Sequence, residues 1–154
     1  MFHLILFEPE IPPNTGNIIR LCANTGAVLH LVQPLGFSLD DAQLRRAGLD
    51  YRDLAQLRVH ANLAVCLALL GGTRIFAVET GSGARHTDRQ YQAGDAFLFG
   101  RETSGLPGPV LAQFPVENVI RLPMIPGNRS INMSNAAAIV LFEAWRQLGF
   151  AGGS

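Results

Sequence analysis

The sequence contains no lysine, so all twelve of its basic residues are arginines, and twelve acidic residues balance them. A phosphate-binding loop of the type GxxxxGK[ST] takes its cation from a lysine, and no such motif occurs in this chain. The net charge of zero argues against a protein that coats nucleic acid. It does not exclude a local arginine patch that positions phosphates.

Cysteine and long apolar runs are also scarce. The two cysteines, Cys22 and Cys66, form no CxxC motif, which favours a reduced pair in a cytosolic protein. No apolar run reaches the ~18 residues that indicate a membrane span. The first residues, Met1 to Leu4, lack the basic region of a secretory signal. These features predict a cytoplasmic protein without membrane contact.

The four histidines are far apart in the sequence and show none of the spacings typical of metal ligands. They are His3, His30, His60 and His86. The sequence therefore predicts no metal site.

Length and apolar content predict one domain over residues 1–154, with an ordered core at about 1–149, because 48% hydrophobic residues are enough for a sizeable core. Short apolar runs predict strands, and capped or periodic segments between them predict helices. The expected strands are 2–8, 28–32, 74–78, 96–99 and 120–122, and the main expected helices are about 15–24, 63–70, 109–113 and 132–148. This alternation predicts an α/β fold with an open, mostly parallel sheet and helices on both faces.

The last of these helices is apolar almost all round, from Ala136 to Trp145. A helix on the surface of a small domain normally has a polar outer face, so this helix is expected to be covered on both sides. In a chain of this length, the second cover could be another subunit. The polar loop before it, residues 127–130, lies where α/β proteins place their ligand sites, at a strand end next to a buried helix.

Three weaker signals come from shorter patterns. Residues 81–86 resemble a dinucleotide-binding fingerprint, but His86 replaces its third glycine, so an NAD site is the least favoured interpretation. Gly100 follows a strand and would let a ligand approach the backbone. Glu102, close behind it, could meet a ligand or substrate hydroxyl, or cap the helix at 109–113. Spacing alone gives Arg20 no role beyond that of a surface arginine.

Four segments together resemble one family, the SPOUT methyltransferases, and most closely its tRNA wobble-nucleotide 2′-O-methyltransferases, the TrmL (YibK-like) group. The segments are PEIPPNTGNIIRLCANTG, RRAGLDY, FGRETSGLP and IRLPMIPGNRSINMSNAAAIVLFEAWRQLG. The resemblance implies a C-terminal trefoil knot and an S-adenosylmethionine pocket at the interface of an obligate homodimer. It also implies a catalytic domain without an appended RNA-binding domain.

The resemblance implies roles for particular residues, most of them in the loops after the strands. Backbone groups at Val78, Gly100, Leu122 and Met133 would hold the adenine and ribose, with a side-chain contact from Ser130. The full cofactor set is Val78, Glu79, Thr80, Gly100, Glu102, Leu122, Ser130, Asn132 and Met133. The implied catalytic residues are Arg20, Glu102, Asn14 and Asn135. The implied RNA-binding residues are Arg45, Arg46, Tyr51, Arg52 and Arg101.

The implied reaction moves a methyl group from S-adenosylmethionine to the ribose 2′-oxygen of nucleotide 34, a cytidine or uridine in the anticodon stem-loop, in leucine tRNAs. No metal takes part. Because a guanidinium is effectively never deprotonated in a protein, we expect Arg20 to hold the phosphate and stabilise the developing alkoxide, while water or Glu102 takes the proton. The alternatives are another tRNA position, ribosomal RNA, or a non-catalytic RNA-binding dimer.

Overall fold

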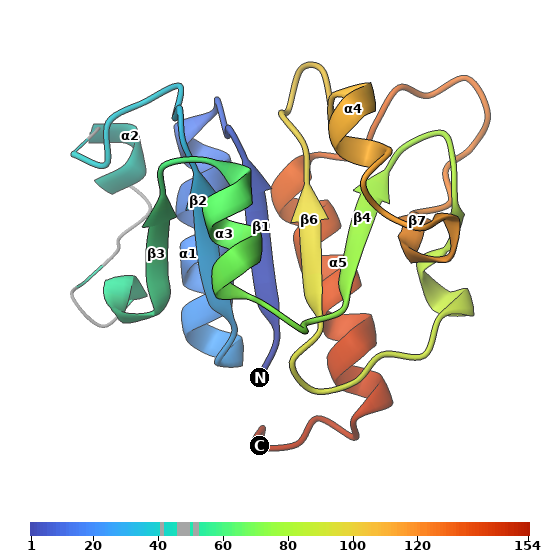
Figure 1. Cartoon of the computed structure of the whole chain (residues 1–154). Coiled ribbons are helices and arrows are strands. Elements are labelled where there is room, and N and C mark those ends of the chain that lie inside the picture. Colours follow the sequence, from blue (N-terminus) through green and yellow to red (C-terminus); the bar gives the residue numbers. More distant parts are fainter. Residues whose placement is uncertain (41, 46–49, 51–52) are drawn as a thin grey trace.

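The computed structural model describes residues 1–40, 42–45, 50 and 53–154, with the side chains of residues 45 and 55 outside that description. The described residues form one parallel sheet with the strand order β3-β2-β1-β6-β4-β7-β5 (Figure 1). The strands are β1 His3–Phe7, β2 Val28–Val32, β3 Leu57–His60, β4 Ile75–Glu79, β5 Ala84–Arg85, β6 Ala96–Phe99 and β7 Val119–Arg121.

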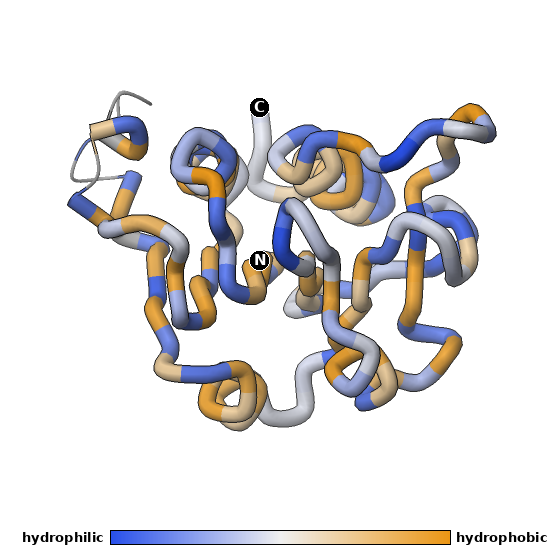
Figure 2. Tube along the Cα trace, turned by 90° about the horizontal axis from the view of Figure 1, so that it is seen from above, coloured by the Kyte–Doolittle hydropathy of each residue, from blue (hydrophilic) through white to orange (hydrophobic). Residues whose placement is uncertain are grey.

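Helices cover both faces of this sheet, as predicted. They are α1 Pro12–Thr25, α2 Ala42–Arg45, α3 Leu63–Leu69, α4 Gly108–Leu111 and α5 Met133–Gln147, with 3₁₀ turns at Asp53–Gln56, His86–Asp88 and Val116–Asn118. Helices α1 and α5 lie side by side on one face, and α3 and α4 lie on the other (Figures 1 and 2).

The two faces have separate hydrophobic cores, because successive side chains of a strand point to opposite sides. In β1, Leu4 and Leu6 join the core under α1 and α5, whereas Ile5 and Phe7 join the core under α3 and α4. The strands in the middle of the sheet are therefore mostly apolar at consecutive positions rather than at alternate ones, and His30 of β2 is a buried polar exception. The two free cysteines are divided in the same way, with Cys22 in the first core and Cys66 in the second.

The C-terminal helix begins and ends close to its predicted bounds. The Asn132 side chain accepts hydrogen bonds from the backbone N–H groups of Ser134 (2.9 Å) and Asn135 (3.3 Å), so it caps the first turn. The helix ends before Gly149, which has a φ of +65°. The residues after Gly149 fold back on the helix, and the Trp145 indole donates to the backbone oxygen of Ala151 at 3.1 Å.

The start of α1 corrects one prediction. Asn14 or Thr15 was expected to cap this helix, but it begins earlier, at Pro12, and the preceding Ile11 offers no side-chain cap. Proline suits the first helical position because its missing N–H would have no partner there. Asn14 and Thr15 are consequently buried inside the first turn.

The sequence did not predict strands β3 and β5. Both lie at the edges of the sheet, where a strand is neither buried on both faces nor uniformly apolar. Arg58 and Val59 of β3 are exposed, and β5 has only two residues. The trefoil knot stays a prediction. In the described part of the chain, no helix is long and apolar enough to cross a membrane.

Candidate cofactor pocket and active site

A cavity of about 570 Å³ opens at the carboxyl ends of β4, β6 and β7. Three loops line it, and each follows one of these strands: residues 78–80, residues 99–105 and residues 122–133. In a parallel sheet, the loops at the carboxyl ends of neighbouring strands converge on one edge, which makes this edge the usual ligand site of an α/β protein. Asn14 of helix α1 and Ile11, the residue just before this helix, line the cavity from one side.

All nine residues expected to bind the cofactor line this cavity. They are Val78, Glu79, Thr80, Gly100, Glu102, Leu122, Ser130, Asn132 and Met133. Asn14 and Arg101 line it as well. The loops that carry them are up to 55 positions apart in the sequence, so the fold brings together residues that resemblance had named separately.

The loop after β6 is a tight turn held by its own backbone. Arg101 and Gly105 exchange two hydrogen bonds, with N···O distances of 3.1 and 2.8 Å. A Cβ atom added at Gly100 would lie 2.2 Å from both the Gly105 carbonyl carbon and the Leu106 nitrogen. Gly100 is therefore required for the turn itself, in addition to the close ligand approach that the sequence suggested.

Glu102 joins this turn to the entry of α1. Its two carboxylate oxygens accept hydrogen bonds from the backbone N–H groups of Glu10 (2.8 Å) and Ile11 (3.1 Å). In return, the Glu10 carboxylate accepts from the Thr103 hydroxyl at 2.8 Å. Glu102 thus lies beside the start of α1 rather than capping a helix at 109–113. It satisfies backbone donors of the segment just before α1 while lining the cavity.

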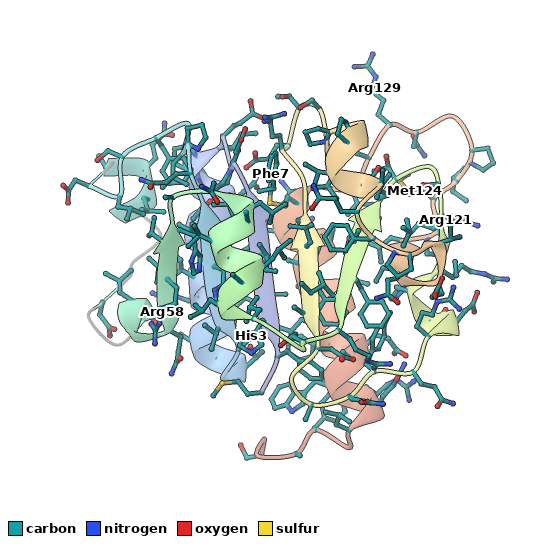
Figure 3. All side chains as sticks on the ribbon, in the orientation of Figure 1. His3, Phe7, Arg58, Arg121, Met124 and Arg129 are labelled. Carbon is teal, nitrogen blue, oxygen red and sulfur yellow. The ribbon has the colours of Figure 1, made fainter. Side chains whose placement is uncertain are left out.

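Arg101 lies at the same rim but points towards β1. Its guanidinium forms an ion pair with Glu8, in which Nε donates to Oε2 at 2.8 Å, and it lies 5.1 Å from the centre of the Phe7 ring. Figure 3 shows Phe7 at the carboxyl end of β1. The Arg101 side chain is 32% exposed, so part of the guanidinium faces solvent. Its contact with RNA stays a prediction.

Two asparagines link the helices on either side of the cavity. The Asn132 amide donates to Oδ1 of Asn14 at 2.9 Å, and Asn132 Oδ1 accepts from the Ser134 hydroxyl at 2.7 Å. Because Asn14 is 5% exposed, this contact fixes α1 against the start of α5 next to the ligand space. The predicted pair of polar residues is thereby brought to one point from positions 118 residues apart.

Two of the predicted catalytic residues do not line the cavity. Arg20 lies on the exposed side of α1, with its guanidinium 3.5 Å from Asp53. Asn135 lies in the exposed first turn of α5. Most of the predicted RNA-binding residues lie outside the part of the chain that the structure describes. They are Arg46, Tyr51, Arg52 and the side chain of Arg45.

The resemblance also implied whole loops, 77–80, 99–102 and 122–133, and these include the lining residues Phe99, Met124, Arg129 and Ile131. The lining residues that were not predicted are Ile11, Thr103, Ser104, Gly105 and Ala136. Most of them continue a predicted stretch, so continuity of the chain would have been the signal for finding them. Arg129 points outwards from the loop before α5 (Figure 3). Its exposed charge at the mouth of the cavity suits a phosphate group.

The family model of the SpoU rRNA methylases matches residues 1–142. The chain belongs to this family. A tRNA (cytidine(34)-2′-O)-methyltransferase of Methylovorus glucosotrophus is 60% identical over 99% of both chains. A solved structure that was described as giving structural insights into the 2-OH methylation of C/U34 on tRNA superposes on this chain with a TM-score of 0.90. Its sequence is 43% identical over 97% of both chains.

A third relative is an rRNA methyltransferase of Sinorhizobium meliloti with AdoMet bound. It is 25% identical and has a TM-score of 0.81 over 96% of this chain and 56% of its own. The seven-stranded parallel sheet is thus that of a SpoU methyltransferase, as the sequence motifs had indicated.

Proposed function

We propose that this SpoU-family protein transfers a methyl group from S-adenosylmethionine to the ribose 2′-oxygen of nucleotide 34 in tRNA. The observation that carries the proposal is the cavity at the carboxyl ends of β4, β6 and β7, which all nine implied cofactor residues line. The full-length similarity to cytidine-34 methyltransferases supports the substrate. Because the proposed substrate is tRNA, we propose a cytoplasmic location. We also propose that residues 1–154 form a single catalytic domain.

The chemistry of the cavity suits the cofactor. Backbone groups of the turn at Gly100 and of the strand ends are fixed in place, so they can bind an adenosine without ordering flexible side chains. Two carboxylates, Glu79 and Glu102, line the cavity and favour the positive charge of a sulfonium. Because the methyl group is already activated, the protein has to align donor and acceptor and assist the loss of one proton from the hydroxyl.

Glu102 has a structural position that bears on proton transfer. Both of its oxygens already accept backbone hydrogen bonds at the start of α1, which use part of their acceptor capacity. We therefore propose that water takes the proton at the 2′-oxygen and that Glu102 mainly fixes the geometry of the turn. Because Arg20 lies outside the cavity of its own chain, it would hold the substrate phosphate and stabilise the developing alkoxide from a second copy of the chain.

We propose that the active form is a homodimer, because the outer face of α5 is apolar and uncovered in one chain. Ile139 is 42% exposed and Phe142 is 45% exposed, and Asn135 is on the same side of the helix at i, i+4 and i+7 spacing. A second copy on this face would cover the apolar side chains. It would also bring a subunit interface to Asn135, a predicted catalytic residue outside the cavity of its own chain.

The decisive experiment separates catalysis from binding at Arg20. Arg20→Ala should fold and bind S-adenosylmethionine like the parent, whereas methyl transfer to tRNA should fall by at least ~100-fold. Arg20→Lys keeps the charge but loses the planar fork, so partial activity would indicate charge stabilisation and near-zero activity would indicate bidentate phosphate binding. The matched control is Arg85→Ala, an exposed arginine paired with Asp88 on the edge strand β5.

The readout is methyl incorporation into unfractionated tRNA, with the modified nucleotide located by mass spectrometry. We expect 2′-O-methylcytidine or 2′-O-methyluridine at position 34, in leucine isoacceptors. Methylation at another position, or only in ribosomal RNA, would contradict the substrate. Full activity of Arg20→Ala would contradict the role of Arg20 but leave the substrate assignment standing.

A further inference from the structure

A cluster of metal-binding side chains lies on the α3 face of the sheet, away from the cofactor cavity. His30 comes from β2, His60 from the end of β3 and Cys66 from α3. One potential ligand atom from each of the three lies within 4.8 Å of the other two. The residues are 2%, 7% and 0% exposed, and none of them lines the cofactor cavity. Sequence spacing predicted no metal, because three separate elements supply the residues.

The fold fixes these positions through the register of the sheet and the cap of α3. His30 pairs with Arg58 and Val32 with His60 in the parallel β2–β3 ladder. Neighbouring Leu29 and Leu31 point to the α1 face, so His30 points to the α3 face. The Asn62 side chain accepts from the Val65 N–H at 2.9 Å, which sets the start of α3 and turns Cys66 towards the sheet.

A third histidine completes the arrangement. His30 Nδ1 lies 2.9 Å from His60 Nε2, and His30 Nε2 lies 3.0 Å from His3 Nδ1. A ligating histidine in a metal site normally uses one ring nitrogen for the metal and donates from the other to an acceptor that fixes its tautomer. His3 stands in the place of that acceptor, so His30 has both a metal-facing nitrogen and an orienting partner.

We propose that His30, His60 and Cys66 bind one Zn²⁺ ion, with His3 as the residue that orients His30. The ligand nitrogens would be His30 Nδ1 and His60 Nε2, which face one another, together with the Cys66 sulfur. A tetrahedral zinc ion sets ligand nitrogens about 3.3 Å apart and nitrogen and sulfur about 3.6 Å apart. The cluster reaches these separations by side-chain shifts of about 1 Å. A water molecule would take the fourth position.

Proton and charge balance are consistent with this ion. Burial keeps the three imidazoles neutral, the form that binds a metal, and lowers the pKa of His30 to about 4. Burial also raises the pKa of the Cys66 thiol to about 11, so zinc must displace the thiol proton to solvent. In the zinc-bound form His60 would carry its ring proton on Nδ1, because Nε2 would bind the metal. The site then holds a dication and a thiolate, and the thiolate neutralises one of the two charges.

The composition of the site distinguishes it from ordinary packing. A buried cysteine alone behaves as a small apolar side chain, as Cys22 does in the other core. Here the thiol lies beside two buried imidazoles that bond one another through His30 Nδ1 and His60 Nε2 at 2.9 Å. A metal ion between them would replace this one hydrogen bond with two metal–nitrogen bonds and would bind the Cys66 sulfur as well. It would tie β2, β3 and α3 into one unit and play no part in methyl transfer.

The first test uses the unmodified protein. After treatment with a chelator and dialysis, native mass spectrometry in the presence of Zn²⁺ should show one ion per chain. Co²⁺ in place of Zn²⁺ should give a thiolate-to-cobalt charge-transfer band in the near ultraviolet, together with the intense visible bands of a tetrahedral ion. No stoichiometric binding, or a spectrum without the thiolate band, would overturn the proposal.

The second test locates the ion. Cys66→Ser should abolish the charge-transfer band, whereas Cys22→Ser, a matched change of a cysteine buried on the opposite face, should keep it. His3→Phe should keep the band and weaken Zn²⁺ affinity by about 10- to 100-fold, because it removes only the orienting acceptor. Circular dichroism checks that each variant folds, and Cys66→Ala replaces Cys66→Ser if that variant does not. Loss of the band in Cys22→Ser alone would place the ion elsewhere and overturn the assignment.

Discussion

Gly100→Ala tests whether the turn after β6 holds the cofactor loop in shape. The added Cβ would lie 2.2 Å from the Gly105 carbonyl carbon and the Leu106 nitrogen, and 2.7 Å from the Gly105 oxygen. These are backbone atoms, which cannot rotate away as the end of a flexible side chain can. Relief would require the two sides of the turn to separate by about 1 Å to reach ordinary contact distance.

The expected cost follows from this separation. Overpacking a tight site costs about 1–3 kcal/mol of stability. Breaking each of the two hydrogen bonds between Arg101 and Gly105 would cost about 1 kcal/mol more. We therefore expect a loss of about 3–5 kcal/mol in the free energy of unfolding. At about 2–4 °C per kcal/mol for a domain of this size, the melting temperature should fall by roughly 6–20 °C. Because the turn lines the cavity, S-adenosylmethionine should bind at least ~10-fold more weakly.

The matched control is Gly81→Ala, because a Cβ there meets no atom within 4 Å and the residue follows Thr80 at the same cavity. Its melting temperature and cofactor affinity should stay within error of the parent. Differential scanning calorimetry measures the first quantity, and isothermal titration with S-adenosylmethionine measures the second. If Gly100→Ala melts and binds like the parent, the turn is able to open without cost and the packing argument is wrong.

Two further predictions concern α5. Phe142→Glu places a charge on the exposed apolar face, so light scattering should show a monomer in place of a dimer of twice the 16.6 kDa chain mass. The control Val116→Glu, at an 82% exposed site away from α5, should stay dimeric. A monomeric parent protein would refute the interface. Hydrogen bonds from Arg146 and Gln147 lower the pKa of Glu143 to about 2. The resulting stability is present above the unfolded pKa of 4.5 and should disappear as the pH falls from about 4.5 to 2. Over this pH range, urea unfolding should show a smaller loss of unfolding free energy in Glu143→Gln than in the parent or in the control Glu117→Gln. Equal losses in all three proteins would contradict the pKa assignment.

Some of the fold follows from local sequence alone. The runs that became β1, β2 and β6 are short, apolar and closed by proline or glycine, so their identity as buried parallel strands does not depend on distant residues. The bounds of α5 follow likewise from Asn132 at its start and Gly149 past its end. The cavity residues were also named before the fold was known, but through a resemblance between motifs rather than through physical reasoning.

Other features depend on contacts between residues far apart in the sequence. Glu102 fixes the entry of α1 through Glu10, 92 positions away, and no local pattern distinguishes this carboxylate from a helix cap. The edge strands β3 and β5 form because a neighbouring strand offers them hydrogen-bond partners, not because of their own composition. Their short mixed sequences have no preference strong enough to predict a strand.

The histidine cluster shows the same division most clearly. His30 and Cys66 are 36 positions apart and show no ligand spacing, so the sequence indicated no metal site. The parallel register of β2 and β3 and the cap of α3 decide that their side chains meet. Sequence determined which strands and helices form, because that choice rests on neighbours along the chain. Only the tertiary structure decided which chemical groups face one another, because that depends on how those elements pack.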